Sequence, residues 1–322
     1  MRPFGSEPNT LSTELRARKN KNYRINKIDS QQSKFYVENF SMLKITGRDN
    51  QKLKLARKVR DGHVKELIFI EGLRLAEEVW RSDLLVKDIY VAETFGQNER
   101  AAQLLRSFRP KNVLINEVSD KIFQSIADTK TSQGIVLICE KPPTDKLKFQ
   151  ADFLPAKDKL PIVVVLHLIN NPSNLGAILR TCEAVNISGV IISQNSADVF
   201  SPKSLRASMG AGFRLNLWTN AAFDEILDWA RTKNLIPTAA DIKSEKSYTE
   251  IDWKRPRLLI FGSEAHGLSA EDLRKIDEGL FIPMDNGVES LNLAVSCGII
   301  LFEAKRQANV QSADFSKLKS AL

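Results

Sequence analysis

Cysteine is scarce in this chain, with three residues in 322. Cys139, Cys182 and Cys297 are far apart and form no Cys-x-x-Cys pair, so neither a zinc site nor a disulfide framework is expected. The three histidines also form no recognisable ligand set. We therefore expect no bound metal, and we interpret the cysteines as small buried side chains in a reducing compartment.

Long apolar runs are missing as well. No stretch approaches the roughly 20 apolar residues of a membrane span, and no secretory signal is recognisable. We therefore expect no membrane as a partner. The hydrophobic content of 43% is enough for a buried core, and a length of 322 residues suggests about two domains.

The net charge of +8 is unevenly placed. Residues 1–60 hold 15 Lys and Arg against 5 Asp and Glu, so the remainder is slightly acidic. A basic arm beside a near-neutral body suits contact with a phosphate backbone. A solvated tail explains the same composition, and a transit peptide is a third reading, against which Glu7, Glu14 and Asp29 count.

Composition and periodicity divide the chain into five parts. Residues 1–40 form a basic arm that is expected to be disordered. Residues 41–141 alternate strands with helices, which is typical of an α/β domain. Prolines and charges at 142–160 predict an interdomain linker. Residues 161–308 repeat the alternation and predict a doubly wound parallel sheet, and a tail follows at 309–322.

Apolar periodicity predicts individual elements in both domains. The first domain is expected to have strands at 66–70, 86–91, 113–115 and 134–139 and helices at 72–81 and 120–127. The second is expected to have strands at 162–168, 189–193, 213–218, 235–239, 257–261 and 281–282 and helices at 175–185, 222–232, 270–276 and 291–307. The last helix is apolar almost all round, which predicts that it is buried.

Three segments that follow strands of the second sheet carry glycine and polar residues. The first is Asn170–Arg180. Asn174 is a good N-cap for the next helix. Gly176 and Ala177 leave a path along which Arg180 reaches back to the loop. Taken alone, this segment is explained better by a plain cap and a surface arginine.

The second segment is Phe261–Leu268. Gly262 allows a ligand to approach the backbone, Gly267 allows a tight turn, and Glu264 lies where parallel sheets bind ligands. The segment is not a P-loop, and the dinucleotide fingerprint Gly-x-Gly-x-x-Gly is absent. Taken alone, it is explained by an ordinary turn between a strand and a helix.

The third segment is Phe281–Ser296, in which a strand, a turn and a helix start gather free backbone N–H groups. An anion site is the first hypothesis for such geometry. Ser290 is the expected N-cap, with Asn292 in the first turn. Capping accounts for Ser290, but neither capping nor packing accounts for Asn292.

Together the three segments resemble the motifs of the SpoU/TrmH family of RNA ribose 2′-O-methyltransferases, in the SPOUT superfamily. Asn171–Arg180 is similar to N-P-x-N-x-G-A-x-x-R, Gly262–Gly267 to G-x-E-x-x-G, and Ile282–Asn292 to I-P-M followed by S-[LF]-N. Ser201–Gly210 is a fourth match. Many members carry an acidic residue just before the proline of the first motif, where this chain has Asn170-Asn171.

The first domain resembles the ribosomal-protein-like substrate-binding domain of many members, through Phe69–Gly72 and Asp128–Gly134. The resemblance implies an α/β fold in which this small domain precedes a parallel-sheet SPOUT domain with a trefoil knot. It also implies a homodimer. The expected location is the cytoplasm, or the mitochondrion if the basic arm is a presequence.

The resemblance implies S-adenosylmethionine as methyl donor and a ribose 2′-hydroxyl of RNA as acceptor. Ribosomal RNA of the 23S type is favoured, with guanosine as the target, and transfer RNA is the alternative. Family members bind the cofactor largely through backbone. Carried over by position, the residues expected around the adenosine are Thr238, Ala239, Gly262, Ile282 and Leu291.

The residues expected at the reacting ribose are Arg180, Asn174, Glu264, Ser290 and Asn292. The resemblance gives Arg180 the task of managing the proton of the hydroxyl. A guanidinium stays protonated near neutral pH and is a poor base, so Arg180 is better suited to bind the neighbouring phosphate and to stabilise a developing alkoxide. Both roles stay open.

Two other classes of function compete with this one. A non-catalytic RNA-binding protein of the same fold is disfavoured because Asn174, Arg180, Glu264 and Asn292 are all present. A nucleotide-dependent enzyme of the Rossmann type is disfavoured because the glycine-rich fingerprint is absent.

Overall fold

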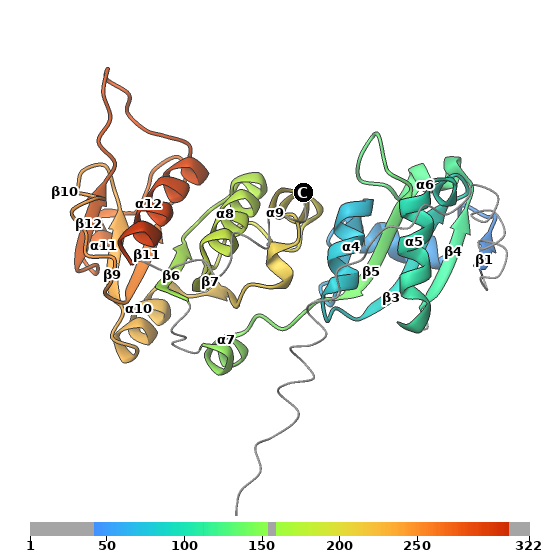
Figure 1. Cartoon of the computed structure of the whole chain (residues 1–322), viewed down its shortest axis with the longest axis horizontal. Coiled ribbons are helices and arrows are strands. Elements are labelled where there is room, and N and C mark those ends of the chain that lie inside the picture. Colours follow the sequence, from blue (N-terminus) through green and yellow to red (C-terminus); the bar gives the residue numbers. More distant parts are fainter. Residues whose placement is uncertain (1–41, 112, 154–158, 309–322) are drawn as a thin grey trace, which may run out of the picture. The chain divides into compact units, whose positions relative to one another are not determined.

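The computed structural model describes residues 42–111, 113–153 and 159–308, which form two β-sheets with accompanying helices (Figure 1). The predictions for the basic arm and for the tail at 309–322 fall outside the described residues. In the part that the structure describes, no helix is long and apolar enough to cross a membrane.

The first sheet has five strands in the order β1-β4-β3-β5-β2. Four of them run in the same direction, and β5 runs against its neighbours β3 and β2. The predicted strands are confirmed to within a few residues. The strand bounds are β1 (Met42–Ile45), β2 (Leu67–Glu71), β3 (Val86–Ala92), β4 (Leu114–Val118) and β5 (Ile135–Glu140).

Four helices and two short 3₁₀ turns accompany this sheet. The two predicted helices are confirmed, and two more, α3 and α5, were not predicted. Their N-caps are Asn50 and Asn98, whose side-chain oxygens accept from the backbone N–H two residues further along the chain. The bounds are α3 (Gln51–Arg60), α4 (Leu73–Arg81), η1 (Phe95–Gln97), α5 (Glu99–Phe108), η2 (Arg109–Lys111) and α6 (Asp120–Ile126).

The second sheet has seven strands in the order β10-β12-β9-β11-β6-β7-β8, and every paired strand is parallel. This confirms the predicted parallel sheet, while the trefoil knot stays a prediction. The continuous apolar run at 162–166 is fully buried, as expected of a central strand. The bounds are β6 (Leu160–Leu166), β7 (Ile187–Ser193), β8 (Leu217–Ala221), β9 (Ile236–Ala240), β10 (Lys246–Ser247), β11 (Arg257–Phe261) and β12 (Glu278–Phe281).

Two strand predictions in this sheet are shifted by three or four residues. β8 begins four residues later than predicted, because Ala211–Phe213 forms a 3₁₀ turn, η3. β12 begins three residues earlier, at Glu278, whose carboxylate binds Arg257 and Lys246. Because β12 begins with a charged residue, a search for apolar runs does not find the first part of this strand.

Helices α7 to α12 belong to this second domain. Their bounds are α7 (Lys146–Asp152), α8 (Pro172–Val185), α9 (Pro202–Ser208), α10 (Phe223–Thr232), α11 (Ala270–Leu273) and α12 (Leu293–Gln307). Helix α7 lies in the segment predicted to be a linker. Phe149 is fully buried and packs edge-on against Trp229, with ring centroids 5.2 Å apart. The segment therefore contributes to the second core.

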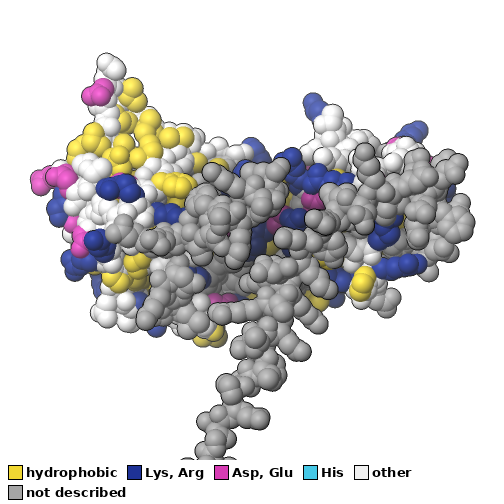
Figure 2. All heavy atoms as spheres, viewed as in Figure 1, with side chains coloured by type: hydrophobic (Ala, Val, Ile, Leu, Met, Phe, Trp, Pro, Cys, Tyr) yellow, Lys and Arg dark blue, Asp and Glu magenta, His cyan; other side chains and the backbone are white. Residues whose placement is uncertain are grey.

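The prediction that the closing helix is buried holds for one face only. Cys297, Ile300 and Leu301 are buried, whereas Val295 is 50% and Phe302 55% exposed. The described residues of this chain cover the face that packs on α8 and leave the other face open. Figure 2 shows hydrophobic side chains gathered at the upper left, where Figure 1 places α12 and the loop before it.

Candidate active site

A chain of hydrogen bonds brings the three predicted motifs together. Asn174 Nδ2 donates to Glu264 Oε1 at 3.3 Å, and Asn292 Nδ2 donates to Asn174 Oδ1 at 3.2 Å. Asn174 is in the first turn of α8, Glu264 follows β11, and Asn292 follows β12. Residues that are far apart in the sequence thus meet at the carboxyl ends of parallel strands, where such sheets bind ligands.

The Glu264 carboxylate also holds the loop that follows β6. It accepts from the backbone N–H of Asn170 at 3.3 Å and of Asn171 at 3.2 Å. Because these bonds use backbone groups, they do not depend on the side chains at 170 and 171. The asparagine side chains at these two positions are therefore not needed for this contact.

The predicted helix caps are wrong by a few residues at both helix starts. The N-cap of α8 is Asn171, whose Oδ1 accepts from Ser173 N at 2.9 Å, with Pro172 as the first helical residue. The N-cap of α12 is Asn292, whose Oδ1 accepts from the N–H groups of Ala294 and Val295. Proline is favoured at the first helical position, so Pro172 is the signal that indicates Asn171.

The corrected caps explain why the site needs asparagine at 174 and 292. Asn174 lies within the helix, so its side chain is free to bridge Glu264 and Asn292. Asn292 caps its helix through Oδ1 while Nδ2 donates to Asn174. An aspartate caps equally well but cannot donate this bond. Capping therefore does account for half of what Asn292 does.

Arg180 and Ser290 are not drawn into this network. Both are exposed, and neither forms a hydrogen bond or ion pair with another residue that the structure describes. A Cβ on Gly176 would lie 2.5 Å from Ser204 O on α9, so this glycine is needed for the close packing of α8 on α9. The path that Gly176 and Ala177 leave for Arg180 stays a prediction.

The five predicted cofactor residues lie at or near the carboxyl ends of β9, β11 and β12. Ala239 and Gly262 are buried, Ile282 is half-buried, and Leu291 is 37% exposed. Thr238 differs, because its hydroxyl donates to Ile236 O and accepts from Arg257 Nη1 inside the sheet. Thr238 is fully buried, and its strand pairs with β11 on one side and β12 on the other, so the structure gives no support for contact between Thr238 and a ligand.

Most backbone N–H and C=O groups of the segment between β12 and α12 have no backbone hydrogen-bond partner among the described residues. Within residues 282–291, one bond between described backbone groups forms, from Val288 N to Asp285 O at 3.3 Å. Figure 1 shows this segment running out from the sheet before it returns to α12. Unpaired N–H and C=O groups at Ile282 and Leu291 suit an adenine and a ribose that are recognised by backbone, so these residues fit S-adenosylmethionine.

The turn that carries Glu264 is closed on itself. Ser263 and Gly267 exchange two backbone hydrogen bonds, at 3.0 and 2.9 Å. Gly267 has a φ of +65°, and a Cβ on Gly262 would lie 2.2 Å from the carbonyl carbon of Gly267. Both glycines are therefore required by the turn, which fixes the position of Glu264.

His167 comes directly after β6 and is buried. Its ring lies 4.4 Å from that of Phe223, and Nε2 is 3.6 Å from Asp272 Oδ2. Burial lowers the pKa of His167, while Asp272 acts in the opposite direction. Among the residues that the structure describes, no group of three or more His, Cys, Asp or Glu could hold a metal ion.

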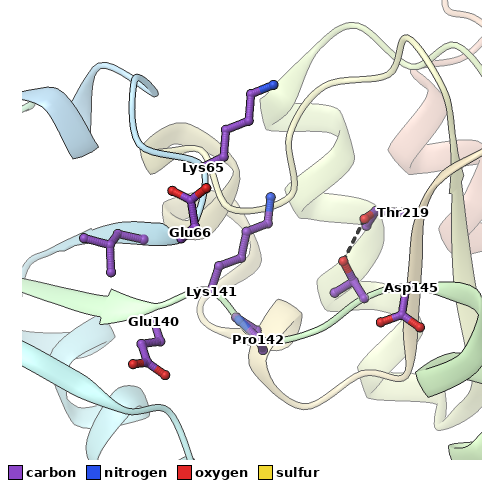
Figure 3. Close-up of a pocket in the computed structure, with 9 residues that line it drawn as sticks. Lys65, Glu66, Glu140, Lys141, Pro142, Asp145 and Thr219 are labelled. Carbon is purple, nitrogen blue, oxygen red and sulfur yellow. Dashed lines mark hydrogen bonds between the residues drawn. The ribbon is translucent and has the colours of Figure 1, made fainter.

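A cavity of about 580 Å³ contains none of the predicted site residues (Figure 3). It adjoins the end of β5, and the hydroxyls of Thr144 and Thr219 lie 2.7 Å apart across its floor. Lysines and acidic residues alternate around it, so no single ligand charge is favoured. Its lining consists of Lys65, Glu66, Leu67, Glu140, Lys141, Pro142, Thr144, Asp145 and Thr219.

Comparison with protein families gives two matches along the chain. Residues 161–302 match the SpoU rRNA methylase family, and residues 69–144 match the RNA 2′-O ribose methyltransferase substrate-binding domain. The first match covers the second sheet with the residues at 174, 264 and 292. The second covers β2 to β5 of the first sheet.

Known relatives and solved structures agree with these matches. The chain is 26% identical over 270 residues to the 23S rRNA (guanosine(2553)-2′-O)-methyltransferase of Bacillus subtilis, covering 82% of this chain and 100% of that protein. It is 27% identical over 301 residues to mitochondrial rRNA methyltransferase 3 of Mus musculus, covering 79% and 70%. An AdoMet-bound rRNA methyltransferase from Sinorhizobium meliloti superposes with a TM-score of 0.72 at 27% identity, covering 82% and 98%.

Proposed function

Because the chain belongs to the SpoU family of RNA 2′-O-ribose methyltransferases, which use S-adenosylmethionine, we propose that its substrate is ribosomal RNA of the 23S type. A guanosine ribose is the favoured acceptor, as in the Bacillus subtilis relative. The observation that supports the location of the reacting site is the chain of hydrogen bonds from Glu264 through Asn174 to Asn292. It joins three motifs at one edge of the sheet, as a substrate site requires.

S-adenosylmethionine, when bound, supplies a methyl group already activated on a sulfonium. The protein therefore has to place the ribose hydroxyl and manage its proton. The backbone at Ile282 and Leu291, together with the Gly262 turn, holds the adenosine in our proposal. Ala239, near the end of β9, lines the same place.

Arg180 binds the phosphate next to the target ribose and stabilises the developing alkoxide. Its guanidinium is exposed and has no partner among the described residues, so its five N–H donors are available to an anion. Ser290 is equally exposed and contacts the substrate in our proposal. Asn174 and Asn292 orient the ribose, and Glu264 fixes both the loop at 170–171 and Asn174.

A second copy of this chain is the proposed partner for the open face of α12. Val288, Leu291, Val295 and Phe302 are each exposed by more than a third. Monomeric proteins seldom leave contiguous apolar side chains in water. A homodimer formed through this face would cover them and bring a second chain close to the loop that holds Leu291.

Phe302→Glu is expected to produce a monomer, because a charge at the centre of an apolar interface is left unpaired. Light scattering at micromolar concentration measures the mass. Leu147→Glu is the matched control, since Leu147 on α7 is 78% exposed and lies away from α12. A monomeric wild type, or a dimer that survives Phe302→Glu, would refute the proposal.

The proposed location is the cytoplasm, with the mitochondrion as the alternative. A relative from Bacillus subtilis supports the first, and mitochondrial relatives support the second. A fluorescent fusion of the whole chain with and without residues 1–40 distinguishes the two. Loss of mitochondrial signal upon deletion would make the arm a presequence.

The function is tested by incubating the protein with methyl-labelled S-adenosylmethionine and total RNA. We expect label in large-subunit ribosomal RNA, recovered as a 2′-O-methylguanosine after nuclease digestion. If label appears in transfer RNA alone, the substrate is transfer RNA and the proposal of ribosomal RNA is wrong. Binding of S-adenosylmethionine without transfer to any RNA would instead favour a non-catalytic RNA-binding protein.

A further inference from the structure

A second cavity lies wholly within the first domain, at the carboxyl ends of β3 and β4. It has a volume of about 440 Å³, within the usual range for ligand pockets. None of the predicted site residues lines it. The lining residues are Leu73, Ala92, Thr94, Phe95, Asn98, Ala101, Asp120, Phe123, Gln124, Ser132, Gln133 and Gly134.

The cavity combines an apolar wall with amide groups. Phe95 and Phe123 are almost entirely buried and supply the apolar side. Asn98 accepts from Arg100 N through Oδ1, and Gln133 accepts from Leu73 N through Oε1. Both side chains are exposed, and their NH₂ groups have no acceptor in the part of the chain that the structure describes.

Buried contacts hold the walls of the cavity in place. Glu71, 5% exposed, accepts from the backbone N–H groups of Asp128 and Thr129 at 2.8 and 3.2 Å and from the Thr129 hydroxyl at 2.6 Å. Gly134 has a φ of +80°, and a Cβ there would lie 3.3 Å from Ala92 Cβ. The loop at 128–134 is thus fixed before any ligand binds.

Exposed charges of both signs flank lining residues in the sequence. Arg74 follows Leu73 and Lys121 follows Asp120, while Glu93 precedes Thr94 and Glu99 follows Asn98. Among the lining residues, exposed Asp120 presents a carboxylate that accepts from the Thr94 hydroxyl at 2.9 Å. A bare anion is therefore not favoured in the cavity.

We propose that this cavity binds one unpaired nucleotide of the RNA substrate through its base. This inference rests on the proposed function, since it assumes that RNA is the substrate. The amides of Asn98 and Gln133 and the carboxylate of Asp120 provide donors and an acceptor for base edges. Proteins that read RNA select bases that are splayed out from single strands or loops.

Two isosteric substitutions test the proposal without disturbing the fold. Asn98→Asp and Gln133→Glu keep the oxygens that accept from Arg100 N and Leu73 N, but each removes an NH₂ donor. Gln103→Glu is the matched control, because Gln103 is an exposed residue of α5 outside the cavity and undergoes the same charge change.

The probes are fluorescein-labelled single-stranded hexanucleotides, tested as separate homopolymers of A, G, C and U, and a 12-base-pair RNA duplex. The wild-type protein is expected to bind at least one hexanucleotide. Each cavity variant should weaken that binding about fivefold or more relative to Gln103→Glu, as expected for the loss of a hydrogen bond. Binding of the duplex should stay within about twofold of the control, and melting temperatures should not change.

Equal hexanucleotide affinity for the cavity variants and Gln103→Glu would overturn the proposal. So would an equal loss on the duplex, because this would indicate charge rather than base recognition. Failure of this inference is distinguishable from failure of the proposed function. If wild type methylates RNA and the cavity variants have the KM of the control, only the cavity assignment fails. If wild type transfers no methyl group to any RNA, the proposed function fails.

Discussion

Glu71 in the first domain and Glu264 in the second make the same hydrogen-bond pattern in different surroundings. Glu71 is the last residue of β2, and Glu264 follows β11. Each carboxylate accepts from two consecutive backbone N–H groups and from one side chain. Glu71 is 5% exposed, and its bonds are 2.6–3.2 Å long. Glu264 is exposed, and its bonds are 3.2–3.3 Å long.

The difference in burial gives the hydrogen bonds of Glu71 and those of Glu264 different roles. An N–H group that loses its acceptor inside the protein cannot turn to water, so Glu71 is needed for folding of the loop at 128–134. Around Glu264 water can replace each lost bond, so stability depends little on it. The exposed carboxylate is instead suited to orient Asn174, and through it Asn292, against a substrate.

Arg180→Lys is expected to have the largest effect, on the Glu264 side of this comparison. A point charge does not replace the planar fork of a guanidinium, so kcat should fall about 100-fold, while the Kd for S-adenosylmethionine stays within about twofold. Steady-state methyl transfer and calorimetry measure the two quantities. Arg255→Lys, at an exposed arginine outside the site, is the control. Wild-type turnover by Arg180→Lys would remove Arg180 from the proposed mechanism.

The pair Glu71→Gln and Glu264→Gln tests the comparison itself. Glu71→Gln turns an NH₂ group toward buried N–H donors and should lower the free energy of unfolding by about 1–3 kcal/mol. Glu264→Gln should change it by less than about 0.5 kcal/mol while lowering kcat. Urea unfolding and methyl-transfer assays of both variants give the answer. The comparison is wrong if Glu264→Gln is the more destabilised protein.

The smallest expected effect concerns His167, whose backbone N–H donates to Phe261 O, next to the Glu264 turn. Burial lowers the pKa of His167 below the free value of about 6.5, against the opposing effect of Asp272. The neutral ring therefore contributes stability that is fully present above about pH 6.5 and is lost as the pH falls through the folded-state pKa. His167→Gln should flatten this part of the pH dependence of unfolding.

Exposed His63 is the matched control for that experiment. His63→Gln should keep the wild-type pH profile of urea unfolding between pH 5 and 7.5. If His167→Gln also keeps it, titration of His167 does not contribute to the stability of this domain.

The elements that periodicity predicts well are those whose own residues carry the signal. β6 and β11 are buried on both faces and are continuous apolar runs. Helix α7 was not predicted, because its packing depends on one buried residue, Phe149, in a segment of prolines and charged residues. The exposed face of α12 could not be foreseen either, because burial depends on what the rest of the chain covers.

For the site, three of the five predicted catalytic residues meet in the structure, whereas Arg180 and Ser290 form no contact with them that the structure describes. The contact of Asn174 with Glu264 and Asn292 follows from motifs at the ends of parallel strands. The caps were misplaced because several asparagines and serines compete at each helix start, and only Pro172 distinguishes among them. The engagement of the Thr238 hydroxyl with Arg257 was beyond the sequence, since strand register sets it.

Mapping of 2′-O-methyl groups in ribosomal RNA tests the central claim most directly. The map is compared between cells that lack this protein and the same cells supplied with wild type or with Arg180→Lys. One methylated ribose should disappear without the protein, return with wild type, and stay absent or strongly reduced with Arg180→Lys. A map that does not change when the protein is removed, or that Arg180→Lys restores in full, would contradict the account.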